Sequence, residues 1–181
     1  MGKKITIDSA TLANKGLEVI EASYLFSVDA ENIDVVIHRQ SIVHSAIQTA
    51  DGAVYALLSP PDMTLPIAMA IDPELSSKAV APLSFRDLSL TFSAWDEKRF
   101  PMLSLAYRAI REGGNLPIAY CAADEACVNA FLNNRISFMD IPAIVQETME
   151  RCKGTEPSSI DEILDEARSF HQMAETLCLS R

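Results

Sequence analysis

Residues 8–18, with the sequence DSATLANKGLE, bring acids, hydroxyls, an amide and an ammonium close together. Asn14 and Glu18 are one helical turn apart and Lys15 lies between them, so on a helix these side chains share one patch. Hydroxyl, amide and ammonium donors at a helix start suit a phosphate, and a carboxylate suits a hard divalent cation. Together with Ser9, the patch is therefore a candidate site for a phosphate and a metal ion side by side.

The same residues also fit a simpler interpretation. Ser9 and Thr11 could cap a helix, and Lys15 with Glu18 could form an ordinary surface ion pair. A single carboxylate is also few for a catalytic metal, which usually takes two or more protein oxygens, and Asp8 could equally cap the following turn. By itself the segment therefore predicts about half of a metal site.

The elements around this segment follow from the pattern of apolar residues. Residues 3–7 alternate and include β-branched side chains, which predicts a short strand that leads into the motif. An apolar stripe at helical spacing then indicates a helix, formed by Ala13, Leu17, Ile20 and Tyr24. We therefore expect the motif to follow a strand and to open a helix.

Three further strands are expected after this helix, with a hairpin turn at Asp51-Gly52 between the last two. They are residues 33–38, 41–49 and 53–58. Several of them are apolar on both faces, so the sheet needs a cover from helices or from a second subunit. A short helix at residues 63–71 should follow.

From residue 100 onwards the apolar period is helical. Helices are expected after Pro101, at residues 118–133, at residues 141–152 and from Ser159, where Glu162 completes a capping box. The predicted fold class is α+β, with a mixed sheet and helices followed by a linker and a small α-helical bundle. The predicted domains are residues 1–72, 73–98 and 99–181.

Composition excludes several classes of function. The formal net charge is -10 and no run of Lys or Arg is present, so nucleic acid is not an expected partner. No apolar run approaches the roughly 20 residues of a membrane span. The four cysteines form no CxxC pair, which favours reduced thiols in a cytoplasmic protein. With only six glycines and no strand-led GxGxxG, we expect no dinucleotide-binding fold within this chain.

Several ordered motifs together resemble the 1-deoxy-D-xylulose 5-phosphate reductoisomerase family. They are DSATLANKGLE, IHRQSIVHS, DGAVYALL, PPDM, LTFSAWDEKRFPMLSLAYRA and CAADEACVNAFL. The resemblance implies an enzyme of non-mevalonate isoprenoid biosynthesis that makes 2-C-methyl-D-erythritol 4-phosphate by a metal-dependent rearrangement and hydride transfer from NADPH. It runs along the whole chain, yet corresponds to roughly the last half of the family's enzyme: part of the catalytic domain, a linker and the helical domain.

The resemblance also implies roles for the first motif. Ser9, Asn14 and Lys15 would bind the phosphate of the phosphosugar substrate, and Glu18 would bind Mg²⁺ or Mn²⁺ together with substrate oxygens. Lys15 and Glu18 would thus count as catalytic, with His44 as a third catalytic residue. For His44 a histidine that is hydrogen-bonded within the sheet is the alternative.

Two further residues would lie near NADPH in the resemblance: Gly2, at the end of an active-site flap, and Met63, near the nicotinamide. Simple core packing is the alternative for Met63. The sequence departs from the family where Arg39 stands in place of a frequent proline and Asp124 in place of a frequent asparagine. Neither change touches the phosphate motif.

The family forms a homodimer through its central sheet, which would supply the missing cover. Its NADPH-binding domain and two further metal-binding acids precede the segment matched here, so we expect the chain alone to lack turnover. The alternative hypothesis is a non-catalytic phosphate-binding or oligomerisation module.

Overall fold

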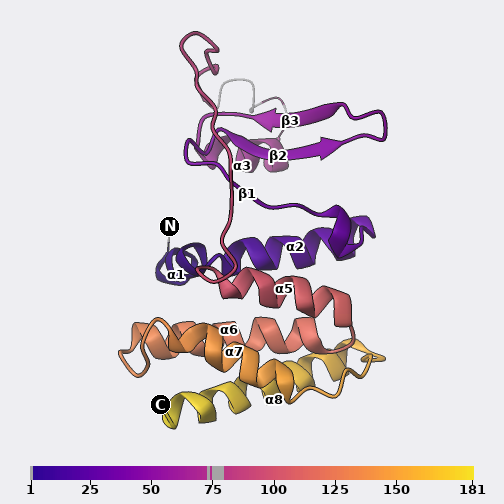
Figure 1. The fold of residues 1–181 in the computed structure, drawn as a ribbon, viewed down its shortest axis with the longest axis vertical. Coiled ribbons are helices and arrows are strands. Elements are labelled where there is room, and N and C mark those ends of the chain that lie inside the picture. The colour runs from indigo at the N-terminus through magenta and orange to yellow at the C-terminus, as the bar shows by residue number, and fades with distance from the viewer. Residues whose placement is uncertain (1, 73, 75–79) are drawn as a thin grey trace. The chain divides into compact units, whose positions relative to one another are not determined.

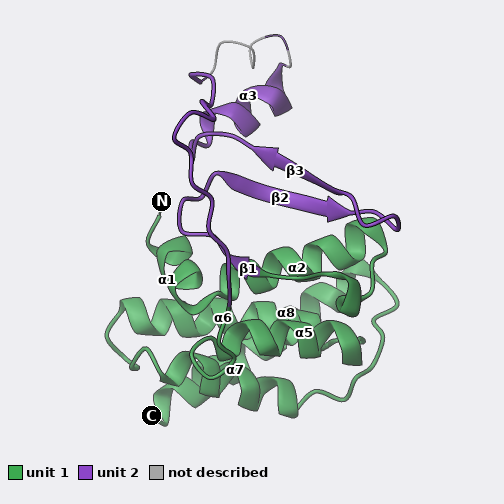
Figure 2. Cartoon of the chain, turned by 45° about the horizontal axis from the view of Figure 1, so that its top comes forward, with its two compact units in different colours: residues 1–35, 95–181 green, residues 36–94 purple. Residues whose placement is uncertain are grey.

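The computed structural model describes residues 2–72, 74 and 80–181, and the chain divides into two units. One unit contains residues 1–35 and 95–181 and is helical, and the other contains residues 36–94 with small antiparallel sheets and helix α3 (Figures 1 and 2). The α+β class is thus confirmed. The domain boundaries expected at residues 72 and 98 stay a prediction.

The first element is a helix, α1 (Lys3–Thr11), so the strand expected at residues 3–7 was wrong. Nζ of Lys4 lies 2.6 Å from Oδ2 of Asp8 one turn further on, and Ile7 packs against the core of the helical unit. Both contacts require helical spacing. Packing and ion pairing have overridden the β-branched alternation, whose influence depends strongly on context.

Helix α2 (Ala13–Phe26) follows directly, because Leu12 turns the chain with a positive φ of 61°. Ala13 and Ile20 are buried, as the predicted stripe requires. Tyr24, at 63% exposure, lies outside the core, so its place in that stripe was wrong.

Four helices form the bundle, close to their expected positions: α5 (Pro101–Glu112), α6 (Leu116–Leu132), α7 (Asp140–Glu150) and α8 (Ile160–Leu179). Helix α6 is central, since it packs on α5, α7 and α8 (Figure 1). The N–H of Glu162 donates to Oγ of Ser159, which confirms that cap, whereas the Glu162 carboxylate accepts from the N–H of Ser158.

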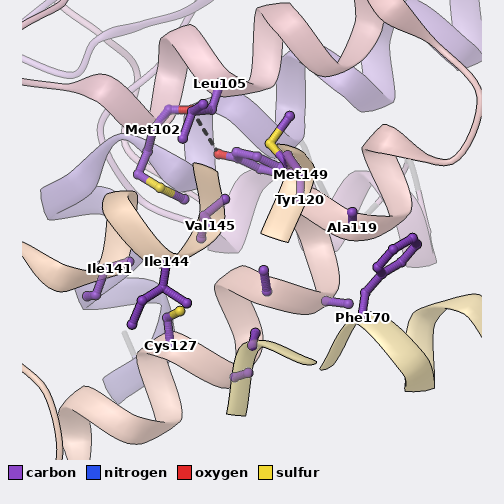
Figure 3. Close-up of a cluster of buried hydrophobic side chains, with 14 of the residues drawn as sticks. Met102, Leu105, Ala119, Tyr120, Cys127, Ile141, Ile144, Val145, Met149 and Phe170 are labelled. Atoms are coloured by element: carbon purple, nitrogen blue, oxygen red, sulfur yellow. Dashed lines mark hydrogen bonds between the residues drawn. The ribbon is translucent and has the colours of Figure 1, made fainter. Parts of the chain in front are cut away.

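The interior of the bundle is apolar and well covered. Figure 3 shows side chains from α5, α6, α7 and α8 that meet around α6. The largest fully buried side chains include Tyr120, Met102, Ile141, Ile144 and Met149. Burial of each such side chain contributes about 1.5–3 kcal/mol to the free energy of unfolding. The bundle is therefore a stable support for the helices that pack on it.

In the other unit, β2 (Val43–Gln48) and β3 (Val54–Leu58) form the predicted antiparallel hairpin. A separate pair joins β1 (Val36–Ile37) to β4 (Ser93–Ala94). The strand expected at residues 33–38 is therefore shorter than predicted.

The pairing of β4 lies within the segment that was expected to be only a linker. Both sheets in the described residues are antiparallel, so the expected mixed sheet that would include residues 3–7 was wrong. The short helix after the hairpin is confirmed as α3 (Thr64–Ile71), and a 3-10 turn, η1 (Ala30–Asn32), follows α2. Residues 73 and 75–79 of the predicted linker lie outside the described residues.

Within the described ranges, every helix is too short or too polar to cross a membrane.

Candidate phosphate and metal site

Asn14, Lys15 and Glu18 meet in the first turns of α2, as predicted. Nδ2 of Asn14 donates to Oε1 of Glu18 at 2.8 Å, and the Lys15 ammonium donates to Oε2 of the same carboxylate. The Lys15 and Glu18 side chains are 39% and 47% exposed, so a small molecule can reach both. N–H groups in the first helical turn have no intrahelical acceptor, and they form the positive end of the helix dipole. The patch can therefore offer neutral donors, a cation and a carboxylate at one place.

Ser9 lies in the last turn of α1, immediately before the corner that leads into α2. The Ser9 hydroxyl does not cap α2. The N–H of Ala13, the first residue of α2, donates instead to Oγ1 of Thr11 at 3.2 Å, and the N-cap residue Leu12 gives no side-chain hydrogen bond. The capping interpretation is thus confirmed for Thr11 and wrong for Ser9. The exposed Ser9 hydroxyl is free for another role.

Close packing holds α2 against the bundle behind this patch. The buried Tyr120 hydroxyl donates to the Met102 carbonyl at 3.2 Å, a contact drawn in Figure 3, and lies 3.5 Å from the Ala13 carbonyl. A Cβ at Gly16 would lie 2.6 Å from that hydroxyl and 2.8 Å from Cβ of Ala106. Only glycine therefore permits this approach of α2 to α5 and α6.

A charged cluster beneath α1 was not predicted. Nζ of Lys4 lies 2.6 Å from Oδ2 of Asp8 and 3.0 Å from Oδ2 of Asp124 on α6. The two aspartates are 3% and 1% exposed, and their Oδ1 atoms have no hydrogen-bond partner. The capping role considered for Asp8 is therefore wrong for its side chain. The helical spacing of Lys4 and Asp8 was a usable signal, as was the acid at Asp124 within an alanine-rich helix.

Electrostatics in this cluster favour a shared charge. Burial, followed by the nearby Asp8 carboxylate, raises the pKa of Asp124 to about 6. Burial works against the charge of Lys4, but the hydrogen bond to Asp8 and the charge of Asp124 outweigh it and raise the Lys4 pKa. The ammonium therefore stays charged between two carboxyl groups, one of which accepts a proton readily.

His44 and Met63 lie in the unit of residues 36–94, apart in sequence from the patch. His44 stands where the register of β2 shifts between Val43 and Ser45, and its Nε2 is 2.9 Å from Oγ of Ser59. Such irregularities re-aim a side chain. Met63 is 69% exposed, so core packing, the alternative for this residue, was wrong.

Gly2 occupies the N-cap position of α1, where an added Cβ would meet nothing within 4 Å. Packing in this chain therefore does not require a glycine at that position.

The described residues contain no group of three or more His, Cys, Asp or Glu side chains placed to hold a metal ion. Glu18 by itself has the charge and oxygen chemistry of one ligand to a hard cation. The residues present thus fit a partial metal site, whose other ligands would come from substrate, water or further protein.

The corner between α1 and α2 thus presents hydroxyl, amide and ammonium donors and one carboxylate beside the helical bundle. Residues 58–173 match the family model described as DXP reductoisomerase C-terminal domain, and residues 1–26 match the model described as 1-deoxy-D-xylulose 5-phosphate reductoisomerase C-terminal domain. The chain belongs to the 1-deoxy-D-xylulose 5-phosphate reductoisomerase family, as its motifs predicted.

Relatives of this family are similar along nearly the whole chain. The reductoisomerase of Trichlorobacter lovleyi is 50% identical over 180 residues, which cover 98% of this chain and 46% of the relative. That of Prosthecochloris aestuarii is 50% identical over 181 residues, which cover 99% of this chain and 47% of the relative. The chain thus spans about half the length of the curated relatives it matches.

Solved structures show the same fold. The reductoisomerase of Zymomonas mobilis in complex with NADPH has a TM-score of 0.87 and 37% identity, covering 98% of this chain and 48% of that one. A DOX-P reductoisomerase in complex with NADPH, fosmidomycin and magnesium has a TM-score of 0.87 and 39% identity, covering 99% of this chain and 47% of that one.

Proposed function

We propose that this chain is the C-terminal part of an enzyme that converts 1-deoxy-D-xylulose 5-phosphate to 2-C-methyl-D-erythritol 4-phosphate with NADPH and a divalent metal. The observation that carries the proposal is the convergence of Asn14, Lys15 and Glu18 in a chain of this family. Relatives with NADPH, fosmidomycin and magnesium bound support the same chemistry.

In this proposal Ser9, Asn14 and Lys15 bind the substrate phosphate. The Ser9 hydroxyl and the Asn14 amide supply neutral donors, and the Lys15 ammonium supplies the opposing charge. A phosphate fixed at one end orients the carbon skeleton, so that binding energy remote from the reacting atoms is used to position them.

Glu18 would hold the metal ion, for which we propose Mg²⁺ or Mn²⁺. Such an ion supplies Lewis-acid polarisation of the substrate's carbonyl and hydroxyl oxygens. Glu18 also accepts hydrogen bonds from Asn14 and Lys15, so this carboxylate links the metal side of the patch to the phosphate side.

We assign three residues to supporting roles near the reacting atoms. His44, whose Nε2 lies next to the Ser59 hydroxyl and whose side chain is exposed, would act beside the substrate. Met63, also exposed, would contact the nicotinamide, and Gly2 would lie by NADPH. We also infer a cytoplasmic location, supported by four free cysteines, because disulfides are rare in that compartment.

We further propose a homodimer formed through the hairpin of β2 and β3. The pairing of Ile47 with Tyr55 and of Ser45 with Leu57 places three large apolar side chains on one face. Ile47, Tyr55 and Leu57 are 67%, 61% and 58% exposed. An apolar patch of this kind on a protein surface is typical of an interaction site.

Substitution of Ile47 by Asp should convert the dimer to a monomer, because it buries a charge in that face. Sedimentation velocity of the purified chain measures this directly. The control is Ile160→Asp, which places the same charge at another exposed isoleucine, on α8, and should leave the dimer intact. A monomeric unsubstituted chain would contradict the proposed interface.

The proposed activity is tested by NADPH oxidation with 1-deoxy-D-xylulose 5-phosphate and Mn²⁺. We expect no turnover by this chain alone, because Glu18 is the only metal ligand proposed within it. Turnover should occur when the chain is mixed with a separately made upstream half of a related enzyme.

Two outcomes would count against this proposal. Reproducible turnover by the chain alone would show that its site is more complete than proposed. No turnover in the mixture, with both halves folded and associated, would favour the non-catalytic phosphate-binding or oligomerisation module.

A further inference from the structure

We propose that Asp124 is a positioning residue for the candidate site. Its contact with Lys4, which also contacts Asp8, holds α1 and the Ser9 that α1 carries against α6. The strength of these contacts changes with pH. The inference rests on the proposed function only in the roles given to the patch. Its geometry is independent of those roles.

The first support is the path of contacts. Lys4 joins Asp124 of α6 to Asp8 of α1 by contacts of 3.0 and 2.6 Å. The Asp8 carbonyl accepts from Oγ1 of Thr11 at 3.2 Å, and that oxygen accepts from the N–H of Ala13, the first residue of α2. Hydrogen bonds therefore run continuously from α6 to the start of the helix that carries the patch.

The second support is the face of α6 on which Asp124 lies. Tyr120 is one turn earlier, and its hydroxyl lies next to the Ala13 carbonyl. One face of α6 thus contacts α1 through Asp124 and α2 through Tyr120. A change in the protonation of Asp124 should therefore alter the structure at the corner between α1 and α2.

The third support is the state of the buried oxygens. Oδ1 of Asp8 and Oδ1 of Asp124 have no partner, although both side chains are almost fully buried. One ammonium serves two carboxyl groups, so a proton on one of them removes an uncompensated buried charge. Protonation should therefore strengthen the cluster, and its loss should loosen it.

The groups that act on Asp124 are few. From α1 they are Lys4 and Asp8; from α6 itself they are Glu125 and three less acidic groups. These three are Tyr120, Cys121 and Cys127. Among the described residues, Lys4 and Asp8 are the charged groups from another helix that act on Asp124. Titration of Asp124 is therefore transmitted to α1.

The sign of the pH effect follows from these contacts. Because the folded-state pKa of Asp124 is raised to about 6, the folded chain binds this proton more tightly than the unfolded chain. The contribution of Asp124 to stability is therefore greatest in acid and is lost as the pH rises through about 6.

The test is a pH titration of the backbone amide NMR signals in the purified chain. The signals of Ser9, Asn14 and Lys15 should move with a common midpoint near pH 6. In Asp124→Asn this movement should disappear. In the control Glu125→Gln, which removes a carboxylate from the adjacent exposed position, it should remain.

A second variant keeps the test decisive if Asp124→Asn folds poorly. Lys4→Met removes both the link from Asp124 to α1 and the cation that favours ionised Asp124. The movement at Ser9 should therefore be lost, while the midpoint measured at the Asp124 amide itself should move above that of the unsubstituted chain. Movement that persists in Asp124→Asn, or a midpoint that is unchanged in Lys4→Met, would overturn the inference. Substrate is not used, so failure here is distinct from failure of the proposed activity.

Discussion

Replacing Gly16 by alanine should lower the free energy of unfolding by about 3 kcal/mol. The new Cβ would lie 2.6 Å from the Tyr120 hydroxyl and 2.8 Å from Cβ of Ala106, so either the ring or a helix must shift. Movement of the ring would also take the buried Tyr120 hydroxyl away from the Met102 carbonyl that now accepts its hydrogen bond. The gain in helix propensity, about 1 kcal/mol, is too small to offset these losses. Urea unfolding followed by circular dichroism measures the change.

Two further variants show whether the close approach is the cause. Gly2→Ala adds the same atom where nothing lies within 4 Å, and should change stability by less than about 1 kcal/mol. Tyr120→Phe removes the atom nearest to the new Cβ, so combining it with Gly16→Ala should cost less than the two single changes added together. Full additivity, or a Gly16→Ala chain as stable as the original, would contradict this explanation.

The helical bundle could be predicted because its signals are local. Pro101 at the start of α5, Gly113 after its end and Ser159 before α8 mark boundaries with residues whose backbone chemistry suits those positions. Their apolar periods are long enough to be distinct from a strand. The hairpin was predictable for the same reason, since Asp51-Gly52 lies between two alternating segments.

Helix α1 and the second sheet could not be predicted in this way. The contact that helps fix α1 joins Lys4 to Asp124, 120 residues away, and no local period reports it. Strands β1 and β4 are two residues each, and they pair across the whole hairpin and α3. Such short strands carry no period of their own.

The candidate site divides in the same manner. The patch of Asn14, Lys15 and Glu18 was predictable, because helical spacing by itself determines which side chains meet. Its support was not, because Tyr120 and Asp124 reach it from a helix about a hundred residues later in the chain. Gly16 is the residue in the sequence that this packing requires, but the requirement can be recognised only when the position of Tyr120 on α6 is known.

Glu18→Gln should abolish most of the activity of the enzyme reconstituted from this chain and an upstream half. Loss of an outer-shell partner typically costs about 10–100-fold, so loss of a ligand carboxylate should cost at least about 100-fold in kcat/KM. The fold should be nearly unaffected, because the Lys15–Glu18 pair is largely exposed and such pairs contribute about 0–1 kcal/mol. Steady-state kinetics at several Mg²⁺ concentrations, with thermal unfolding of the same samples, separates the two effects.

The matched control is Glu21→Gln, which removes the same charge from an exposed position on the same helix. It should leave kcat/KM within about twofold of the original. Equal activity in the two variants would remove Glu18 from the metal site and favour the non-catalytic module.

Anion binding provides an independent measure of what Glu18 does. In the ligand-free chain its carboxylate occupies the Lys15 ammonium and the Asn14 amide, so a phosphate must compete with Glu18 for both donors. Glu18→Gln weakens that competition and should therefore bind sulfate, a probe of constant charge, more tightly while its turnover is lost. A merely structural ion pair would also predict tighter sulfate binding, but no loss of turnover. Tighter anion binding combined with lost turnover would identify Glu18 as the group that couples the metal side of this patch to its phosphate side.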